Sequence, residues 1–117
     1  MSSATIHHED GEDGVRTVTL GGRLDMLGVN EIALRFTSLT AARSRRVVVD
    51  LRPVTFLASI GIRTILNSAR AQASKGGKLV LLLGSNELVR STLETTGIGE
   101  VIPMLENGAD AHRQALG

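Results

Sequence analysis

The sequence predicts an α/β domain with a mixed central β-sheet of four to five strands and about four helices. Two continuous apolar stretches, "RRVVVDL" and "KLVLLLG", are typical of strands that are buried on both faces. Segments with helical spacing of apolar residues lie between and after these strands, and this order favours parallel crossovers. The chain has 117 residues, of which 42% are hydrophobic, so we expect one domain over residues 1–117.

The first part of the chain is predicted to form a hairpin and a helix. "ATIHHED" and "VRTVTLGG" are the expected strands, and "GEDG" supplies the turn residues between them. "GGRLDMLGVN" is expected to be a loop leading into a helix, in which apolar residues recur at helical spacing from Val29 through Ile32, Phe36 and Leu39. A second loop, "RPVTF", is expected after "RRVVVDL", because Pro53 does not suit the interior of a central strand.

The rest of the chain shows clear start and stop signals. Residues from about 59 to 74 read as a helix, which "SKGG" ends with Gly76 and Gly77 as left-handed terminators. "SNELVRSTLETTG" predicts another helix, with Ser85 or Asn86 as the cap and Gly97 as the stop. "EVIPML" is expected to be a short edge segment, and "ENGADAHRQALG" a last short helix.

Composition argues against nucleic acids and membranes as direct partners. Aromatic residues make up 2% of the chain, so stacking on bases is not available, and 13 basic against 12 acidic residues leave no basic footprint. The N-terminal "MSSATIHHED" lacks the pattern of a signal peptide. The longest apolar run, "LVLLL", is too short to span a bilayer. We therefore expect no direct nucleic-acid contact and no membrane insertion.

The sequence also predicts no metal and no cofactor. His7 and His8 stand beside Glu9 and Asp10, but neighbouring strand residues point to opposite faces and chelate poorly together. "LLLGSNE" has one glycine and no following Lys-Ser/Thr pair, so it does not match a phosphate-binding loop. The absence of cysteine excludes disulfides, thiol catalysis and thiolate ligands, and fits a cytoplasmic protein.

The helix over 59–74 has a candidate docking face. Its predicted core-facing stripe consists of Ile62, Ile65, Leu66, Ala69 and Ala73. Ile60 is then expected to point away from the core, on a face of low charge that it shares with Thr64 and Asn67 and that Arg63 flanks. Such a face suits a partner. The alternative is that a single exposed apolar residue has no special role.

Three interpretations of Ser59 are open. As an N-cap it would accept a backbone N–H and stabilise the helix by about 1 kcal/mol. As a phosphorylation site it would place about −1.5 to −2 charges at the positive end of the helix dipole, with Arg63 one turn on and Arg52 in the preceding loop. As a nucleophile it would need a positioned base, but the three histidines lie in terminal segments, and no Gly-x-Ser-x-Gly pattern surrounds Ser59. We therefore do not expect an enzyme.

Two aspartates stand next to predicted elements. Asp25, in "GRLD", precedes the first helix, and its pattern favours a cap or a turn. Asp50 ends a buried strand, where polar groups often gather around sites in α/β folds. On pattern alone, neither aspartate is assigned a binding role.

Four segments in a fixed order carry a family resemblance: "GRLD", "VVVDL", "FLASIGIRTIL" and "SKGGKLVLLLGSNELVRSTLETTGIGEVIPML". Together they resemble a STAS domain and, more narrowly, a bacterial anti-sigma factor antagonist. The resemblance covers about 15–105, almost the whole chain. It implies that the unmodified protein binds an anti-sigma factor that is also a GHKL-type serine kinase, which frees a sigma factor. Phosphorylation then breaks the complex and a phosphatase restores it.

The resemblance extends to single residues. Ser59 matches the first serine of the family's Asp-Ser-Ser/Thr-Gly-Leu pattern and is the expected phosphorylation site, and Gly61 matches its glycine. Asp25 matches the aspartate of the family's Gly-x-Leu-Asp stretch. Two positions depart from the pattern: Ala58 replaces the usual aspartate, and Ile60 replaces a small residue.

The helix periodicity and the family resemblance together predict the partner-binding surface. It comprises Asp25, Ala58, Ile60, Gly61, Arg63, Thr64 and Asn67. A phosphate at its edge would bring charge into a desolvated interface and release the partner. The alternative is a STAS accessory or scaffold subunit, for example of a lipid-transport ABC system, that docks by the same helix face without phosphorylation. A small hydrolase that uses Ser59 is the third interpretation.

Overall fold

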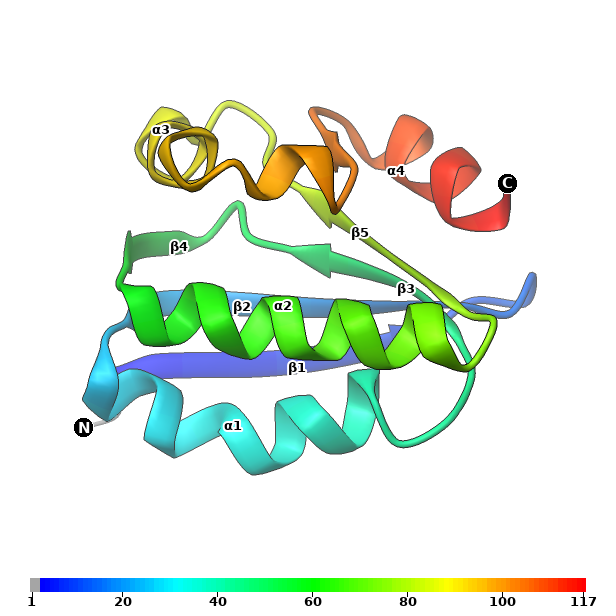
Figure 1. Ribbon diagram of the computed structural model, residues 1–117, viewed down its shortest axis with the longest axis horizontal. Helices are drawn as coiled ribbons and strands as arrows, with labels where there is room; N and C mark the ends of the chain where they lie inside the picture. Colours follow the sequence, from blue (N-terminus) through cyan, green and yellow to red (C-terminus); the bar gives the residue numbers. More distant parts are fainter. Residues whose placement is uncertain (1–2) are drawn as a thin grey trace.

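One mixed sheet of six strands forms the centre of the molecule (Figure 1). The computed structural model describes residues 3–117. The strands are β1 (Ala4–Asp10), β2 (Val15–Leu24), β3 (Arg46–Asp50), β4 (Val54–Leu57), β5 (Lys78–Leu82) and β6 (Met104–Leu105). Their order is β1-β2-β3-β5-β6, and β4 pairs with the last part of β2. Strand β1 is antiparallel to β2 and the other pairs are parallel, which confirms the predicted mixed α/β fold.

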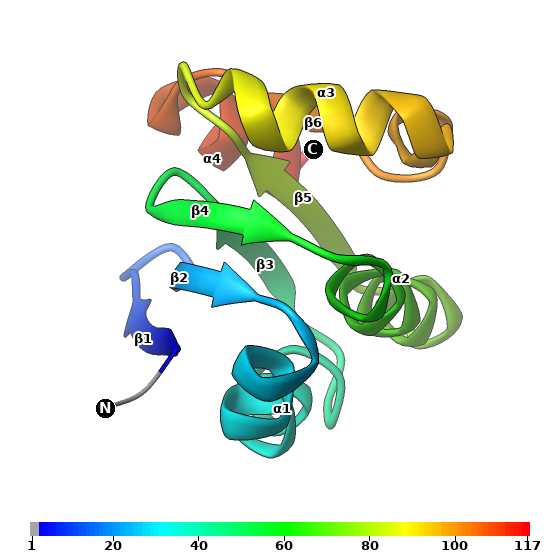
Figure 2. The same cartoon turned by 90° about the vertical axis from the view of Figure 1, so that its left-hand side faces the viewer.

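Three helices pack on one face of the sheet and a fourth packs on the other (Figure 2). The helices are α1 (Met26–Thr40), α2 (Ser59–Ser74), α3 (Glu87–Thr96) and α4 (Gly108–Leu116), and a short 3-10 turn, η1 (Ile98–Glu100), follows α3. Apolar side chains of α1, α2 and α3 share one core cluster, whereas Ala111 and Ala115 of α4 pack on the opposite face. Within residues 3–117, no helix combines the length and apolarity needed to cross a bilayer.

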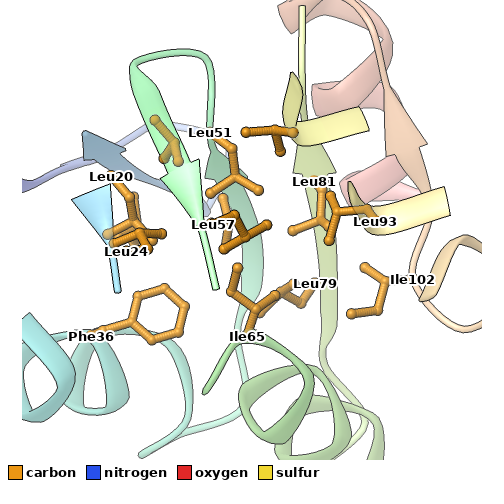
Figure 3. Packing of buried hydrophobic residues seen from close by; sticks show 14 of the residues in the cluster. Leu20, Leu24, Phe36, Leu51, Leu57, Ile65, Leu79, Leu81, Leu93 and Ile102 are labelled. Atoms are coloured by element: carbon orange, nitrogen blue, oxygen red, sulfur yellow. The ribbon is translucent and has the colours of Figure 1, made fainter. Parts of the chain in front are cut away.

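Strand β3 shows why the central strands are apolar throughout. Val47 and Val49 belong to the core under α1, α2 and α3, whereas Val48 belongs to the cluster under α4. Strand β5 alternates in the same way, with Leu81 on the first face and Val80 on the second. The expectation that both strands are buried on two faces is therefore confirmed. Figure 3 shows the larger core side chains converging from the sheet and the helices.

The prediction that "RPVTF" is a loop is wrong. Residues Val54–Leu57 form β4, which pairs with β2 from Gly22 to Leu24, with a register shift between Gly22 and Arg23. Pro53 lies just before this strand, so its missing N–H does not interrupt the ladder. The predicted loop "GGRLDMLGVN" is likewise the end of β2 and the start of α1. The sheet consequently has six strands instead of the expected four to five.

The predicted ends of α3 are confirmed, and the predicted stop of α2 is confirmed in part. Asn86 caps α3 by accepting the Val89 amide at 3.2 Å, and Gly97 ends that helix at φ 73°. Gly76 is left-handed at φ 79°, but Gly77 is not. Gly77 is instead a place of close approach: a Cβ there would lie 2.0 Å from Oε1 of Gln72.

Candidate functional site

Ser59 is the first residue of α2, and it is not the N-cap. Ala58 occupies the cap position in an extended conformation, with φ −91° and ψ 169°, and no side chain caps the helix. The Ser59 side chain is exposed. The capping interpretation of Ser59 is therefore wrong, because the cap lies one residue earlier, at a residue without a polar side chain.

Two backbone amides at this end of α2 have no backbone acceptor within residues 3–117. They belong to Ser59 and Ile60, whereas the Gly61 amide donates to the Ala58 carbonyl oxygen at 3.0 Å. Unused first-turn amides and the helix dipole make this end electropositive. An anionic group on Ser59 would therefore meet open hydrogen-bond donors.

Gly61 allows α2 to begin directly against the end of β2. The Ala58 amide donates to the Leu24 carbonyl oxygen at 3.0 Å. A Cβ on Gly61 would lie 3.1 Å from that oxygen and 2.8 Å from Cδ1 of Leu57, so a larger side chain requires movement. Because Asp25 follows Leu24, this contact brings Asp25 to the same end of the sheet as the start of α2 (Figure 1).

Asp25 is the N-cap of α1, as its pattern predicted. Its Oδ1 accepts the Gly28 amide at 2.8 Å, and its Oδ2 accepts Nε of Arg23 at 3.2 Å. The hydrogen bond from the Gly28 amide, followed by that from Arg23, holds the pKa of Asp25 below its ordinary value. Asp25 is consequently ionised at neutral pH and held in place by two hydrogen bonds at the border of the candidate surface.

Three exposed apolar residues lie on the segments next to Asp25: two follow it in α1, and one is on β4 opposite Arg23. Met26 and Leu27 are 66% and 64% exposed, and Phe56 is 38% exposed. The guanidinium of Arg23 lies 4.4 Å from the centroid of the Phe56 ring, which links the ring to the Arg23–Asp25 pair. Sequence reasoning missed this group, Met26, Leu27 and Phe56, which we call the apolar rim. The available signal was the apolar pair that stands directly between Asp25 and the periodic part of the helix.

The outward face of α2 differs from the predicted one. Ile60 and Thr64 are partly buried, and Ile60 packs against the core cluster. They lie in one row with Ser68, whose hydroxyl accepts that of Thr40 in α1 at 2.8 Å, so this row faces α1. The expectation that Ile60 points away from the core is therefore wrong.

The exposed ridge of α2 runs instead through Ser59, Arg63, Asn67, Arg70 and Ser74. The helix is rotated relative to the prediction because two polar residues, Ser68 and Gln72, are buried in place of the expected Ala73, which is exposed. Sequence periodicity assigns the buried face from apolar residues alone and misses such a rotation. Of the expected partner-binding side chains on α2, those of Arg63 and Asn67 are exposed.

A shallow groove separates Ser59 from α3. Its walls are formed by Ala58, Ser59 and Ile62 on one side and by Ser91, Thr92, Thr95 and Thr96 on the other. None of these residues carries an imidazole or a carboxylate, so the groove offers Ser59 no general base. The sequence had no periodic signal for this hydroxyl-lined wall, because it is created by the packing of α3 on β4.

Arg52 and Asp50 are not part of this surface. Arg52 precedes β4 and Ser59 follows it, so the extended strand separates them. The guanidinium of Arg52 is bound to the buried Asp50 carboxylate at 2.8 Å, which raises the pKa of Arg52. Arg52 also lies against Gly84 at the end of β5. The expectation that Arg52 stands near Ser59 is therefore wrong.

The histidines do not form a metal centre within the part of the chain that the structure describes, where no cluster of three or more potential ligands occurs. His7 and His8 are neighbours on β1, and their side chains alternate across that strand. His112, on α4, contacts Asp13 in the turn of the β1–β2 hairpin. This contact ties α4 to the hairpin and leaves no imidazole in the groove beside Ser59.

Comparison with protein families identifies the fold. The family model described as "Mlab, STAS domain" matches residues 7–106. The chain therefore belongs to the STAS domain family, as its motifs predicted. No curated protein sequence gives a significant match.

Several solved structures share this fold at low sequence identity. An anti-sigma factor antagonist from Mycobacterium paratuberculosis is 22% identical over 100% of both chains, with a TM-score of 0.87. A STAS domain protein from Planctomyces limnophilus, also described as an anti-sigma factor antagonist, is 24% identical over 96% of this chain and 98% of that chain, with a TM-score of 0.80. The murine anion transporter Slc26a9 is 13% identical over 99% of this chain and 22% of that chain, with a TM-score of 0.71. At these identities the likeness shows the fold.

Proposed function

We propose that this chain is an anti-sigma factor antagonist of a partner-switching system in the cytoplasm. The unmodified protein docks on an anti-sigma factor that is also a GHKL-type serine kinase, and a sigma factor is thereby freed. The observation that carries the proposal is the position of Ser59, which is exposed at the first residue of α2 and is not used as a cap. The anti-sigma factor antagonists among the proteins that share the fold support the choice of partner.

The docking surface extends from the N-terminal part of the α2 ridge, from Ser59 to Asn67, to the start of α1. It includes the predicted residues Asp25, Ala58, Ile60, Gly61, Arg63, Thr64 and Asn67, to which the geometry adds the apolar rim. In this arrangement Gly61 and Ile60 position the start of α2, while Arg63, Asn67 and the rim contact the partner. Exposed apolar side chains bordered by Arg23 and Asp25 have the character of a protein interface.

Phosphorylation of Ser59 is the proposed release step. The kinase transfers the γ-phosphoryl group of ATP to the Ser59 hydroxyl oxygen, the bond to ADP breaks, and the hydroxyl proton is lost; a phosphatase hydrolyses the ester. The new group carries about −1.5 to −2 charges. The open amides of Ser59 and Ile60, together with Arg63 one turn on, accommodate it in the folded protein. The phosphate therefore destabilises the complex rather than the fold, because an unpaired charge is costly to desolvate at an interface.

The alanine at the cap position, Ala58, also affects the phosphorylation of Ser59. An aspartate at this N-cap position would accept an amide of the first turn and would place a negative charge beside the phosphate. Alanine leaves the amides open and removes that repulsion. The departure from the family pattern thus favours the phosphorylated state on electrostatic grounds, although it removes a group that could position Ser59 for the kinase.

Intact-mass spectrometry tests the proposal. The protein is incubated with ATP and the GHKL-type kinase encoded nearest to it, alongside Ser59→Ala. We expect one added phosphate that the variant lacks, and loss of the kinase complex when the phosphate is present. Ser91→Ala, on the facing wall of the groove, is the matched control and should be phosphorylated like the parent protein. Phosphate on Ser59→Ala, or a complex that survives phosphorylation, contradicts the mechanism.

The second candidate is a STAS accessory or scaffold subunit that docks by the same face without phosphorylation. It is favoured by the Slc26a9 comparison, in which a domain of this fold makes up a small part of a larger transporter chain. Purification with the natural partner discriminates the two, since a transport ATPase supports this candidate and a serine kinase supports the first. Absence of phosphate in the presence of a stable complex would also favour it. The hydrolase interpretation has less support, because the groove beside Ser59 provides no base.

A further inference from the structure

Positive charge is concentrated in one part of the chain. Between residues 41 and 80 the only carboxylate is that of Asp50. The cationic residues in the same range are Arg43, Arg45, Arg46, Arg52, Arg63, Arg70, Lys75 and Lys78. Because the whole chain has 13 basic and 12 acidic residues, this part is strongly positive and the remainder is negative.

Three of these cations are already bound to other groups of the protein. Arg52 pairs with Asp50, Arg46 donates to the Ala115 carbonyl oxygen at 2.8 Å, and Nζ of Lys75 donates to the Ala41 carbonyl oxygen at 2.8 Å. Arg70 and Lys78 are among the cations without such a partner, and neither has a carboxylate within 4.0 Å among residues 3–117. Their charges are therefore available to a ligand.

Arg70 and Lys78 are among the residues that line a hollow in the surface. The hollow has a volume of about 340 Å³ and lies between the C-terminal half of α2, the start of β5 and the segment after η1. Ala69, Ala73, Val101 and Pro103 provide its apolar lining. Val101 is 63% exposed there. Figure 2 shows α2 and the segment after α3 on the same side of the sheet.

We propose that this hollow is a second docking site, which binds an acidic and partly apolar peptide segment of a partner protein. The apolar lining takes an aliphatic side chain of the segment, while Arg70 and Lys78 pair with carboxylates on either side of it. A peptide fits better than a bilayer, because a flat surface does not enter a concave one. A nucleic acid is disfavoured because no aromatic side chain is present in the hollow to stack on a base.

This site is separate from the one proposed around Ser59. Arg70 lies eleven residues after Ser59, three turns along α2, so the two sites occupy opposite halves of the helix. A partner that used both would contact the whole ridge of α2. The second site does not depend on phosphorylation, and its test needs neither the kinase nor ATP.

The probe is a library of displayed twelve-residue peptides, selected on the immobilised protein. We expect recovered peptides to be enriched in Asp and Glu next to Leu, Ile or Val. The binding of a recovered peptide, labelled with fluorescein, is then measured by anisotropy. Arg70→Glu/Lys78→Glu should weaken it at least about tenfold, and added salt should weaken it in the parent protein.

Two control variants keep the test specific. Arg35→Glu/Arg43→Glu makes the same change in net charge outside the hollow and should bind the peptide like the parent protein. Ser59→Asp should also leave peptide binding unchanged, whereas it would weaken docking on the anti-sigma factor. The proposal is overturned if no peptide is enriched, if the recovered peptides are not acidic, or if both double variants lose binding equally. Binding to phosphatidylglycerol vesicles that only Arg70→Glu/Lys78→Glu abolishes would show instead that the occupant is a membrane.

Discussion

The two ends of helix α2 are held in opposite ways. At the C-terminal end, Gln72 is fully buried, and its amide contacts the Thr40 carbonyl oxygen at 2.6 Å, the Arg43 carbonyl oxygen at 2.7 Å and the Arg45 amide at 2.8 Å. At the N-terminal end no side chain caps the helix, and Ser59 is exposed. One end therefore anchors the helix to the loop before β3, while the other leaves the Ser59 hydroxyl exposed and first-turn amides without backbone acceptors.

The largest expected effect comes from removing the anchor. Gln72→Leu leaves buried carbonyl and amide groups of the α1–β3 loop without partners, which we expect to lower the free energy of unfolding by about 3 kcal/mol. Urea denaturation followed by circular dichroism measures this loss. Asn67→Ala, on the exposed ridge of the same helix, is the control and should change stability by less than about 0.5 kcal/mol. A loss below that of the control would show that the loop finds other partners.

The next largest effect is expected on binding of the proposed partner at the uncapped start of α2. Met26→Glu places a charge on the apolar rim and should weaken binding to the anti-sigma factor about tenfold, or ~1.4 kcal/mol, without changing the melting temperature. Titration calorimetry with the purified partner measures it. Leu34→Glu is the control, because Leu34 is 89% exposed on α1 and lies farther from the start of that helix. Equal losses of binding in both variants would place the interface along α1 rather than at the N-terminal start of α2.

A pair of serine variants compares the two ends directly. Ser59 and Ser74 are the first and last residues of α2, and both are exposed. Ser59→Asp should raise the free energy of unfolding by about 0.5 kcal/mol, because a negative charge is favourable at the helix N-terminus. Ser74→Asp should lower it by a similar amount, since the dipole has the opposite sign there. Thermal denaturation at low ionic strength measures both, and the same sign in both variants would contradict the dipole account.

A difference in pH dependence separates the capped start of α1 from the uncapped start of α2. The folded-state pKa of Asp25 is lowered, so its charge contributes stability above the unfolded-state value of 3.8, and this contribution is lost as pH falls through the folded-state pKa. Asp25→Ala should therefore melt at a lower temperature than the parent protein at neutral pH, and the difference should shrink below pH 3.8. Ala58→Gly, at the cap of α2, should show no such pH dependence. A difference that persists at low pH would assign the effect to the cap geometry rather than to the charge.

Much of the fold was predictable because its signals are local. The buried strands β3 and β5 follow from continuous apolar runs, and the positions of Asp25, Asn86 and Gly97 follow from the capping rules of neighbouring residues. The candidate site was predicted in part: its location at the start of α2 came from the family motif, which places Ser59 at a helix head. The apolar rim and the wall formed by α3 were not predicted, because their residues are brought together from separate segments.

Local signals in the chain are enough to predict the order of the helices and of every strand except β4, together with the family and the serine at the head of α2. Tertiary packing determines which face of α2 is buried, since Ser68 and Gln72 are polar residues whose burial depends on partners that lie 27 to 32 positions away in the chain. It also determines that Val54–Leu57 is a strand, because β4 forms only where β2 runs past the end of β3. The physical reason is the same in both cases: periodicity and capping act within a few residues, whereas buried hydrogen bonds and strand pairing depend on segments that folding brings together.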